Sequence, residues 1–206
     1  LGTKGSYVQA DVSDPQAALD LVEKVVTTYG RVDCVANVAA TTSRGSLVDT
    51  TPELFDEHMN VNLRGPFFVM QGAVKDMQRR SAPGTIVNIM SIASHGGQSF
   101  LAPYVASKAG LGGLTKNAAY AHRFDKIRIN GVNIGWTITD GEEVVQRTAH
   151  GAQDGWLEEA SARLPMGKLG QPDEIADFIV YLLSDRSGVV TGSIIDWDQI
   201  VIGGHD

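Results

Sequence analysis

Short apolar runs alternate along the chain with longer stretches in which apolar residues recur every three or four positions. Short apolar runs predict strands, and recurrence near 3.6 residues predicts amphipathic helices. The expected strands are 7–10, 32–36, 86–89, 127–132 and 193–196. The expected helices are 15–29, 50–80, 102–124 and 172–184. Single helices between strands imply βαβ units, so we predict an α/β fold with a doubly wound parallel sheet covered by helices on both faces.

Local signals mark where the helices begin and end. Ser13-Asp14-Pro15 offers a cap and a proline suited to a first helical turn, and Gly30 is suited to end that helix. Thr50–Glu53 marks the start of the second helix, which the pair Gly65-Pro66 is expected to bend. Residues 141–163 mix polar, glycine and aromatic residues, which predicts two short helices in a mobile segment.

Composition and charge narrow the class of protein. The 206 residues are 43% hydrophobic and 20% charged, as in a single globular domain rather than a disordered chain. The net charge of −7 repels phosphate backbones, so we expect no nucleic-acid partner. No apolar run is long enough to span a bilayer, so we expect no membrane span. The single Cys34 and the lack of zinc-type spacing predict no metal site and a reducing, cytoplasmic location.

The strongest candidate for chemistry is a tyrosine–lysine pair. Tyr104 and Lys108 stand four residues apart on a predicted helix, which places them on one face. Moving a phenol pKa from near 10 towards neutrality needs about 4 kcal/mol, which an ammonium about 4 Å away supplies at an effective dielectric near 20. The pair can therefore make Tyr104 a general acid/base. The alternative is a surface lysine that packs along a tyrosine.

Other polar residues stand where the predicted strands end, which is the ligand-binding edge of such sheets. Ser91 follows the strand that begins at residue 86, and its hydroxyl can donate to a carbonyl oxygen that gains charge, or else cap local backbone. Asn37 follows the strand 32–36 and is succeeded by small residues. Asn62 lies inside a predicted helix, where asparagine is disfavoured, so it has either a function or a solvent-facing position.

Taken in order, these residues resemble the single-domain short-chain dehydrogenases/reductases over essentially the whole chain. The segment Tyr104–Ala109 is similar to the family's catalytic Tyr-x-x-x-Lys helix, and Ser91 suits its catalytic serine. The other segments that carry the resemblance are Asp11-Val12, Asn37–Ala40, Asn62–Gly65, Asn130–Thr139 and Leu164–Glu174. The resemblance implies a Rossmann-like fold that binds NAD or NADP.

The resemblance also implies a mechanism, which is hydride transfer between the nicotinamide and a secondary alcohol or its ketone. Tyr104 would act as the general acid/base, and Lys108 would lower its pKa and hold the nicotinamide ribose. Ser91 would orient the substrate oxygen, and Asn62 would anchor a water that relays the proton. The cofactor-binding residues implied are Asp11, Val12, Asn37, Ala39, Met90, Tyr104, Lys108, Ile134, Gly135, Thr137 and Thr139.

Substrate selection would fall to residues 140–163, as a lid that includes His150 and Trp156, together with His95, Gln98 and Trp136. Trp156 in an ordinary packing helix and His95 in a purely structural position are the alternatives. The polar character of this set indicates a small-molecule substrate such as a polyol, a sugar or a hydroxy-carbonyl compound. The family resemblance further suggests a homotetramer packed through the two long helices.

One family feature is missing from the sequence. Nothing before Asp11 can form the Gly-rich turn that packs a pyrophosphate on a helix N-terminus, so the first two βα units appear absent. In the family's strand order 3-2-1-4-5-6-7 they would lie between Tyr7–Ala10 and Val32–Ala36. Residues 1–206 are therefore expected to be a single, N-terminally incomplete domain. The alternative function is a non-catalytic remnant of the fold that serves as a binding or structural subunit.

Overall fold

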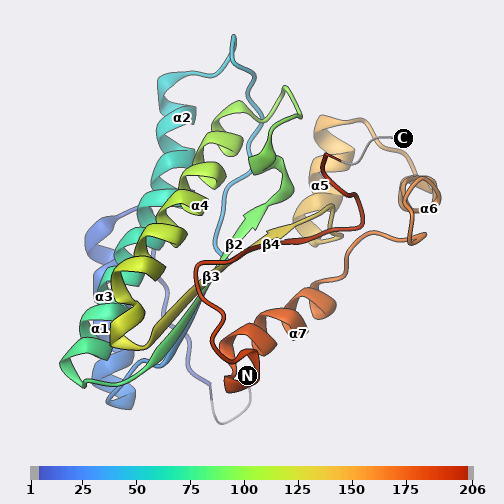
Figure 1. Cartoon of the computed structure of the whole chain (residues 1–206). Coiled ribbons are helices and arrows are strands. Elements are labelled where there is room, and N and C mark those ends of the chain that lie inside the picture. Colours follow the sequence, from blue (N-terminus) through green and yellow to red (C-terminus); the bar gives the residue numbers. More distant parts are fainter. Residues whose placement is uncertain (1–4, 204–206) are drawn as a thin grey trace.

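Four parallel strands form the centre of the computed structural model, which describes residues 5–203 (Figure 1). They lie in the order β1-β2-β3-β4, so each strand pairs with the next one along the chain. Their bounds are Cys34–Asn37 for β1, Gly84–Ser91 for β2, Ile127–Ile134 for β3 and Ile194–Trp197 for β4. All four carboxyl ends therefore meet at one edge of the sheet.

Helices cover both faces of this sheet (Figure 1). On one face lie α1 (Pro15–Tyr29), α2 (Pro52–Met59), α3 (Gly65–Arg79) and α4 (Ala102–His122), and on the other lies α7 (Pro172–Leu183). The two short helices α5 (Asp140–Ala149) and α6 (Trp156–Ala162) follow the carboxyl end of β3. The doubly wound α/β prediction is confirmed, as is the pair of short helices in the segment 141–163.

Each face of the sheet has its own hydrophobic core. On the α1–α4 side, Val22 of α1 packs against Gly72 of α3, where an added Cβ would lie 3.1 Å from the valine. On the other side, Leu182 of α7 packs on Val87 and Val132 of the sheet. Fully burying such a side chain stabilises the fold by roughly 1.5–3 kcal/mol. These contacts hold the strand ends in fixed positions relative to the helices.

The predicted strand at Tyr7–Ala10 is wrong. These residues form no strand, and Tyr7 is 80% exposed. Asp11 next accepts a hydrogen bond from the Ser13 backbone at 2.9 Å and turns the chain towards α1. A β-prone run becomes a strand only when another strand pairs with it, and within residues 5–203 only β2 pairs with β1. The hypothesis that two βα units precede this segment stays a prediction.

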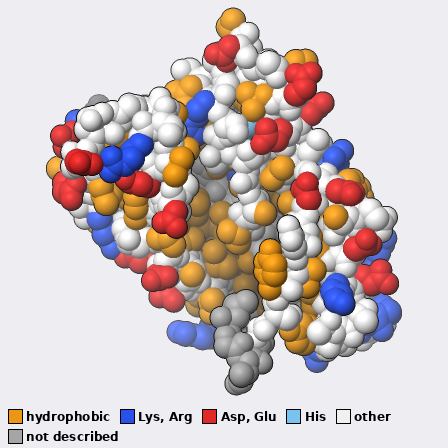
Figure 2. All heavy atoms as spheres, turned by 180° about the vertical axis from the view of Figure 1, so that it is seen from behind, with side chains coloured by type: hydrophobic (Ala, Val, Ile, Leu, Met, Phe, Trp, Pro, Cys, Tyr) orange, Lys and Arg blue, Asp and Glu red, His pale blue; other side chains and the backbone are white. Residues whose placement is uncertain are grey.

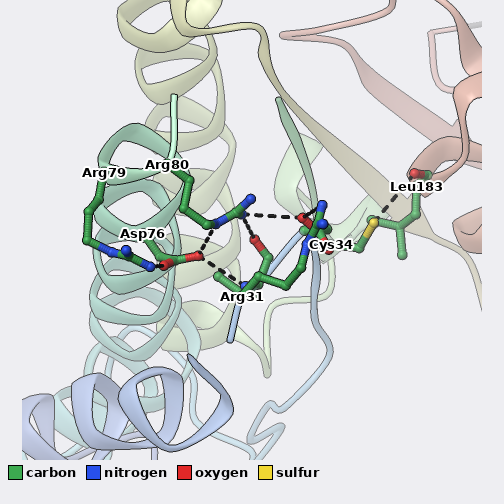
Figure 3. Close-up of polar contacts among 8 residues, drawn as sticks. Arg31, Cys34, Asp76, Arg79, Arg80 and Leu183 are labelled. Atoms are coloured by element: carbon green, nitrogen blue, oxygen red, sulfur yellow. Dashed lines mark hydrogen bonds and ion pairs between the residues drawn. The ribbon is translucent and has the colours of Figure 1, made fainter. Parts of the chain in front are cut away.

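The first strand begins two residues later than predicted, at Cys34 rather than Val32. The Val32 amide donates to the Asp76 carboxylate at 3.1 Å, and its carbonyl accepts from Arg80 at 2.6 Å. Figure 3 shows this network, in which Arg79 also contacts Asp76. The backbone groups of Val32 are therefore bound by Asp76 of α3 and by Arg80 directly after it, and they do not join the ladder.

The long second helix is interrupted before the predicted position. Residues Asn60–Arg64 form a π-helical turn, in which the Gly65 amide donates to the Asn60 carbonyl. Met59, Arg64 and Gly65 all have helical backbone, so Pro66 lies inside a continuous helix, and its missing N–H falls directly after the π-helical turn. A Cβ on Gly65 would lie 2.7 Å from the Val12 carbonyl oxygen, so the glycine lets the Asp11-Val12 segment rest on the helix.

The side of the molecule opposite to that seen in Figure 1 is hollowed, and hydrophobic side chains gather on the floor of the hollow (Figure 2). Along the edge strand β1, exposed Cys34 and Ala36 flank buried Val35.

In the described part of the chain, no helix combines the length and the apolar character needed to cross a membrane. No cluster of three or more potential metal ligands was found among the same residues.

Candidate active site

Ser91, Tyr104 and Lys108 meet at the carboxyl edge of the sheet. Ser91 is the last residue of β2, and Tyr104 lies in the first turn of α4. Lys108 follows one turn later, and its Nζ lies 5.7 Å from the centre of the Tyr104 ring. The predicted placement of both side chains on one helix face is therefore confirmed, and the surface alternative is wrong because both residues are buried.

The ammonium of Lys108 is enclosed by protein. The residue is 2% exposed, and its Nζ donates to the Ile89 carbonyl at 2.8 Å. Burial lowers the pKa of Lys108 to about 8, because the charged form loses its hydration. An ammonium carries three N–H donors, and this bond uses one of them. The other two can serve a ligand at the edge of the sheet.

Burial raises the pKa of Tyr104 above its usual value, although hydrogen bonding from Ser91 and the charge of Arg44 act in the opposite direction. The structure therefore does not show the lowering of the Tyr104 pKa that was expected from Lys108. The Lys108 ammonium is bound to the Ile89 carbonyl, and burial disfavours its charged form. The Ser91 hydroxyl also accepts from the Ala93 amide at 3.2 Å. Ser91 thus caps local backbone and also forms a hydrogen bond with the Tyr104 phenol.

Asn62 holds two segments together beneath Tyr104. It is fully buried on the π-helical turn, so the solvent-facing alternative is wrong. Its side chain accepts from the Thr41 amide at 2.9 Å and donates to the Thr41 carbonyl and the Ser107 hydroxyl, both at 3.0 Å. The Ser107 hydroxyl donates in turn to the Tyr104 carbonyl at 2.7 Å. Asn62 therefore positions the loop after β1 against the catalytic helix.

His58 is a residue that the sequence reasoning missed. It is fully buried one turn before Asn62, and its Nδ1 lies 2.9 Å from the Leu54 carbonyl. Its ring lies edge-on to the Tyr104 ring, with 6.3 Å between centres. Its Nε2 has no hydrogen-bond partner among residues 5–203. Its spacing to Asn62 was the available signal, but that spacing alone does not distinguish a buried histidine from an exposed one.

Asn37 belongs to a polar chain that crosses the sheet. Its amide donates to Asn88 at 2.7 Å, and Asn88 donates to Thr115 of α4 at 2.9 Å. Asn88 and Thr115 are fully buried, so the chain ties β1, β2 and α4 together. Met90 is buried against Gly131, where a Cβ would collide with the methionine, so its side chain is turned into the core. At the edge of the sheet Met90 therefore offers its backbone.

The loop after β3 contains most of the other residues expected to bind the cofactor. Gly135 lies so close to Asp198 that an added Cβ would be 2.0 Å from its Oδ1. Thr137 donates to the Gly135 carbonyl at 3.0 Å, and Thr139 caps α5 by accepting from the Glu142 amide at 3.0 Å. Ile134 and Ala39 are two further residues expected to bind the cofactor. Ile134 packs in the core under α7, whereas Ala39 is exposed beyond β1.

The three expected substrate residues point to different partners. His95 Nε2 lies 2.9 Å from Asp196 on β4. Burial alone would raise the pKa of Asp196, but hydrogen bonds with His95 and Asn133 lower it overall. Trp136 donates to Glu142 of α5 at 2.7 Å, and Gln98 lies in an exposed loop with a φ of 51°. The structure shows no contact that brings these three together.

Trp136 also lies beside two cavities. One, of about 700 Å³, is lined by Gly135, Trp136, Phe178 and Trp197 among others. The other, of about 330 Å³, lies between Trp136 and Trp156, whose ring centres are 6.3 Å apart. Tyr104 lines neither of them. The smaller cavity therefore adjoins the expected lid segment, whereas the larger one lies between α7 and the end of β4.

Comparison with known proteins gives matches along nearly the whole chain. A family model described as Enoyl-(Acyl carrier protein) reductase matches residues 1–199. The chain is 38% identical over 188 residues to 3-oxoacyl-(acyl-carrier-protein) reductase FabG of Thermotoga maritima, covering 91% of this chain and 73% of that protein. It is 33% identical over 195 residues to L-rhamnose 1-dehydrogenase (NAD(P)(+)) of a Sphingomonas species, covering 95% and 75%.

The fold matches solved structures equally well. The structure described as ElxO with NADP bound aligns with a TM-score of 0.84 and 31% sequence identity. That alignment covers 94% of this chain and 77% of the other. The similarity in sequence and that in structure thus extend over the same large part of the chain.

Proposed function

Because the chain belongs to the short-chain dehydrogenase/reductase family, we propose that it is an NAD(P)-dependent oxidoreductase. It would interconvert a secondary alcohol and the corresponding ketone by hydride transfer. The observation that carries this proposal is the buried group of Ser91, Tyr104 and Lys108 at the carboxyl edge of the sheet. Relatives described as a reductase and a dehydrogenase support the same reaction class.

The donors at this edge fit the nicotinamide–ribose end of a dinucleotide. Lys108 has two N–H donors beyond its bond to Ile89, which suits the hydroxyls of a ribose. Asn37, Ala39 and the loop from Ile134 to Thr139 lie at the neighbouring strand ends, while Asp11 and Val12 would take the adenine. When bound, the nicotinamide supplies or accepts the hydride. Residues 5–203 contain no Gly-rich turn for the pyrophosphate, so the fit concerns the nicotinamide end.

Within this proposal the side chains divide the handling of the proton. The Ser91 hydroxyl donates to the substrate oxygen, which gains negative charge during reduction. Tyr104 gives its proton to the same oxygen. Because burial raises the pKa of Tyr104, the phenol stays protonated at neutral pH, which favours its role as an acid in carbonyl reduction. Lys108 carries a positive charge close to both groups, and Asn62 fixes the helix geometry beneath them.

We further propose that residues 140–163 act as a lid and contribute to selection of a polyol, sugar or hydroxy-carbonyl substrate. His150, at the end of α5, lies 3.4 Å from Arg44 of the loop after β1, so the segment already contacts the far side of the site. His95, Gln98 and Trp136 would contribute to the same selection, although each has different surroundings in the structure. A sugar dehydrogenase among the relatives supports a polar substrate.

A homo-oligomer, such as a tetramer in the cytoplasm, completes the proposal. Phe67 on α3, Tyr120 on α4 and Phe124 just beyond α4 are 42%, 68% and 84% exposed. Large exposed apolar side chains on neighbouring helices favour a subunit contact there. Light scattering of the purified chain would give the number of subunits, and a monomeric mass would contradict this part.

The central experiment is a fluorescence titration of the purified chain with NADH and then with NADPH. We expect tight binding of at least one, retained in a Tyr104→Phe variant, followed by oxidation of the bound cofactor when a suitable ketone is added. Binding of neither at millimolar concentration would contradict the proposal. That result would favour a non-catalytic binding or structural subunit.

A further inference from the structure

The loop after β1 places a guanidinium close to the start of the helix that carries Tyr104. Gly45 and Leu101 form an isolated parallel bridge, in which the Gly45 amide donates to the Phe100 carbonyl and the Ala102 amide to the Gly45 carbonyl, both at 2.9 Å. Because α4 begins at Ala102, this bridge fixes the neighbouring Arg44 next to the first turn of the helix that carries Tyr104. The positive charge of Arg44 indeed opposes the burial-driven rise in the pKa of Tyr104.

The Arg44 side chain is held in place but is not neutralised. One terminal nitrogen donates to the Thr42 carbonyl at 2.8 Å, and the other lies 3.4 Å from His150 Nε2. The guanidinium carbon lies 5.5 Å from the centre of the Phe100 ring. Within residues 5–203 no carboxylate forms an ion pair with Arg44, and its Nε is buried without a hydrogen-bond partner.

The acidic group that acts on the same phenol is already engaged. Glu142 tends to raise the pKa of Tyr104, but its Oε1 accepts from Trp136 Nε1 and from Gln146 Nε2, each at 2.7 Å. Arg44, by contrast, keeps a buried donor unused. A buried N–H without a partner is costly, and the planar guanidinium matches a carboxylate with two parallel hydrogen bonds. The geometry therefore favours an anion at Arg44, on the same edge of the sheet as Tyr104.

We propose that Arg44 binds a carboxylate of the substrate, so that the enzyme acts on an acidic hydroxy or keto compound. This inference rests on the proposed oxidoreductase function and adds the charge of the substrate to it. The ketone carbon would take a hydride from the reduced nicotinamide, which is oxidised, and the ketone oxygen would take the proton of Tyr104. His150 and Phe100 flank the guanidinium and would enclose the bound carboxylate, since their rings lie 5.5 Å apart.

A matched pair of substrates tests this proposal. Steady-state reduction of acetoacetate and of its neutral methyl ester would be measured with the parent chain, Arg44→Gln, Arg44→Lys and Arg123→Gln. We expect the parent to prefer the acid in kcat/KM, and Arg44→Gln to lose about 10- to 100-fold on the acid, the range for loss of a charged hydrogen-bond partner. Its kcat/KM for the ester should fall far less than that for the acid, because the ester offers no carboxylate to Arg44.

The other two variants serve as references. Arg44→Lys keeps the charge without the planar fork and should retain part of the acid preference. Arg123→Gln removes the same charge at the far end of α4, where Arg123 lies over Tyr120, and should match the parent on both substrates. Equal losses on acid and ester in Arg44→Gln, or no acid preference in the parent, would overturn the proposal, because Arg44 would then have a purely structural role.

Failure of the proposed function would be recognised separately. If the parent reduces neither compound, acetoacetate binding is measured by titration calorimetry on the parent and on Arg44→Gln. Binding that is at least tenfold weaker in the variant supports the carboxylate site even without turnover. Equal binding, or no binding to the parent, overturns it.

Discussion

At the amino end of β1 the buried carboxylate of Asp76 has three donors, whereas at the carboxyl end of β2 the buried ammonium of Lys108 has one acceptor. Asp76 binds the Val32 amide together with Arg79 and Arg80 (Figure 3). Lys108 binds only the Ile89 carbonyl among the described residues. The pKa values follow this difference. Hydrogen bonds and charges outweigh burial and lower the pKa of Asp76 to about 2, while burial alone lowers that of Lys108 to about 8.

The same contrast holds for the arginines. At the amino end of β3, Arg128 donates to Ser187, Thr85 and backbone carbonyls that include that of Ser184. At the opposite edge, Arg44 keeps an unpaired buried nitrogen. At the amino edge, Asp76 and Arg128 thus have hydrogen-bond partners within the protein, and these partners stabilise both side chains in their charged forms. The charges of Lys108 and Arg44 at the carboxyl edge are left partly unsatisfied, which costs stability and leaves binding capacity for a ligand.

The largest expected effect comes from removing the reactive group at the carboxyl edge. Tyr104→Phe deletes the general acid and should lower kcat about 100- to 10,000-fold, while NADH or NADPH binding stays within about threefold because the phenol hydroxyl is one contact among several. Stopped-flow turnover and fluorescence titration measure the two quantities. Unchanged turnover in this variant would refute the proposed mechanism.

Breaking the satisfied network should cost stability rather than activity. Asp76→Asn removes the charge that Arg79 and Arg80 neutralise and should lower the free energy of unfolding by about 3 kcal/mol. Urea denaturation followed by circular dichroism gives that value. Asp56→Asn, on the exposed side of α2, is the matched control and should change it by less than about 0.5 kcal/mol. A loss no larger than that of the control would contradict the assigned role of Asp76.

Removing the poorly paired ammonium of Lys108 should raise the free energy of unfolding rather than lower it. Lys108 has a folded pKa of about 8 against an ordinary 10.5, so the buried charge costs stability at neutral pH, and the cost fades as pH rises from 8 to 10.5. Lys108→Met should therefore raise the free energy of unfolding at pH 7 by about 2 kcal/mol, after allowance for the lost Ile89 bond. The same variant should bind the cofactor more weakly and lose turnover.

A fall in stability of this variant at pH 7 would contradict that account. A second check is the parent protein, whose unfolding free energy should gain a component between pH 8 and 10.5 that Lys108→Met lacks. Lys116→Met, on the exposed face of the same helix, provides the control for loss of a lysine.

The Asp76 network should also make the stability of the protein depend on pH in the acid range. Its folded pKa of about 2 lies below the ordinary 3.8, so its contribution is complete above about pH 5 and is lost as pH falls towards 2. The contribution is about 2.5 kcal/mol, from roughly 1.4 kcal/mol per pKa unit over the shift from 3.8 to about 2. Urea midpoints measured from pH 5 to pH 2 should fall more in the parent than in Asp76→Asn. Parallel curves would contradict the assignment.

Local patterns predicted most of the fold because they report burial directly. The periodicity of 15–29 and the cap at Asp14 gave α1, whose ends agree with the structure. Residues 7–10 were predicted wrongly because β propensity does not identify a pairing partner. The start of β1 was misplaced because Val32 is bound by Asp76, which stands 44 residues away in the sequence. Neither the lack of a pairing partner for residues 7–10 nor the bond between Val32 and Asp76 leaves a signal in the local sequence.

The candidate site divides in the same way. Tyr104 and Lys108 were found from helical spacing, and Ser91 and Asn62 from their positions relative to predicted elements. Arg44 reaches the phenol only because Gly45 pairs with Leu101, a contact between two loops. His58 joins the group because a π-helical turn changes the face that α2 presents. Loop pairing and helix irregularities depend on the whole chain, so these two residues were missed.

The π-helical turn at Asn60–Arg64 makes the catalytic end unusually sensitive to chain length. A π turn is one residue inserted into an α-helix. Deleting a residue from it would restore a regular helix without breaking α3, and would rotate everything before it by about 100°. His58 would then leave the Tyr104 ring, and Thr41 and the loop attached through Asn62 would lose their register. Natural variation by insertion or deletion should therefore be tolerated in the loops but selected against within these five residues.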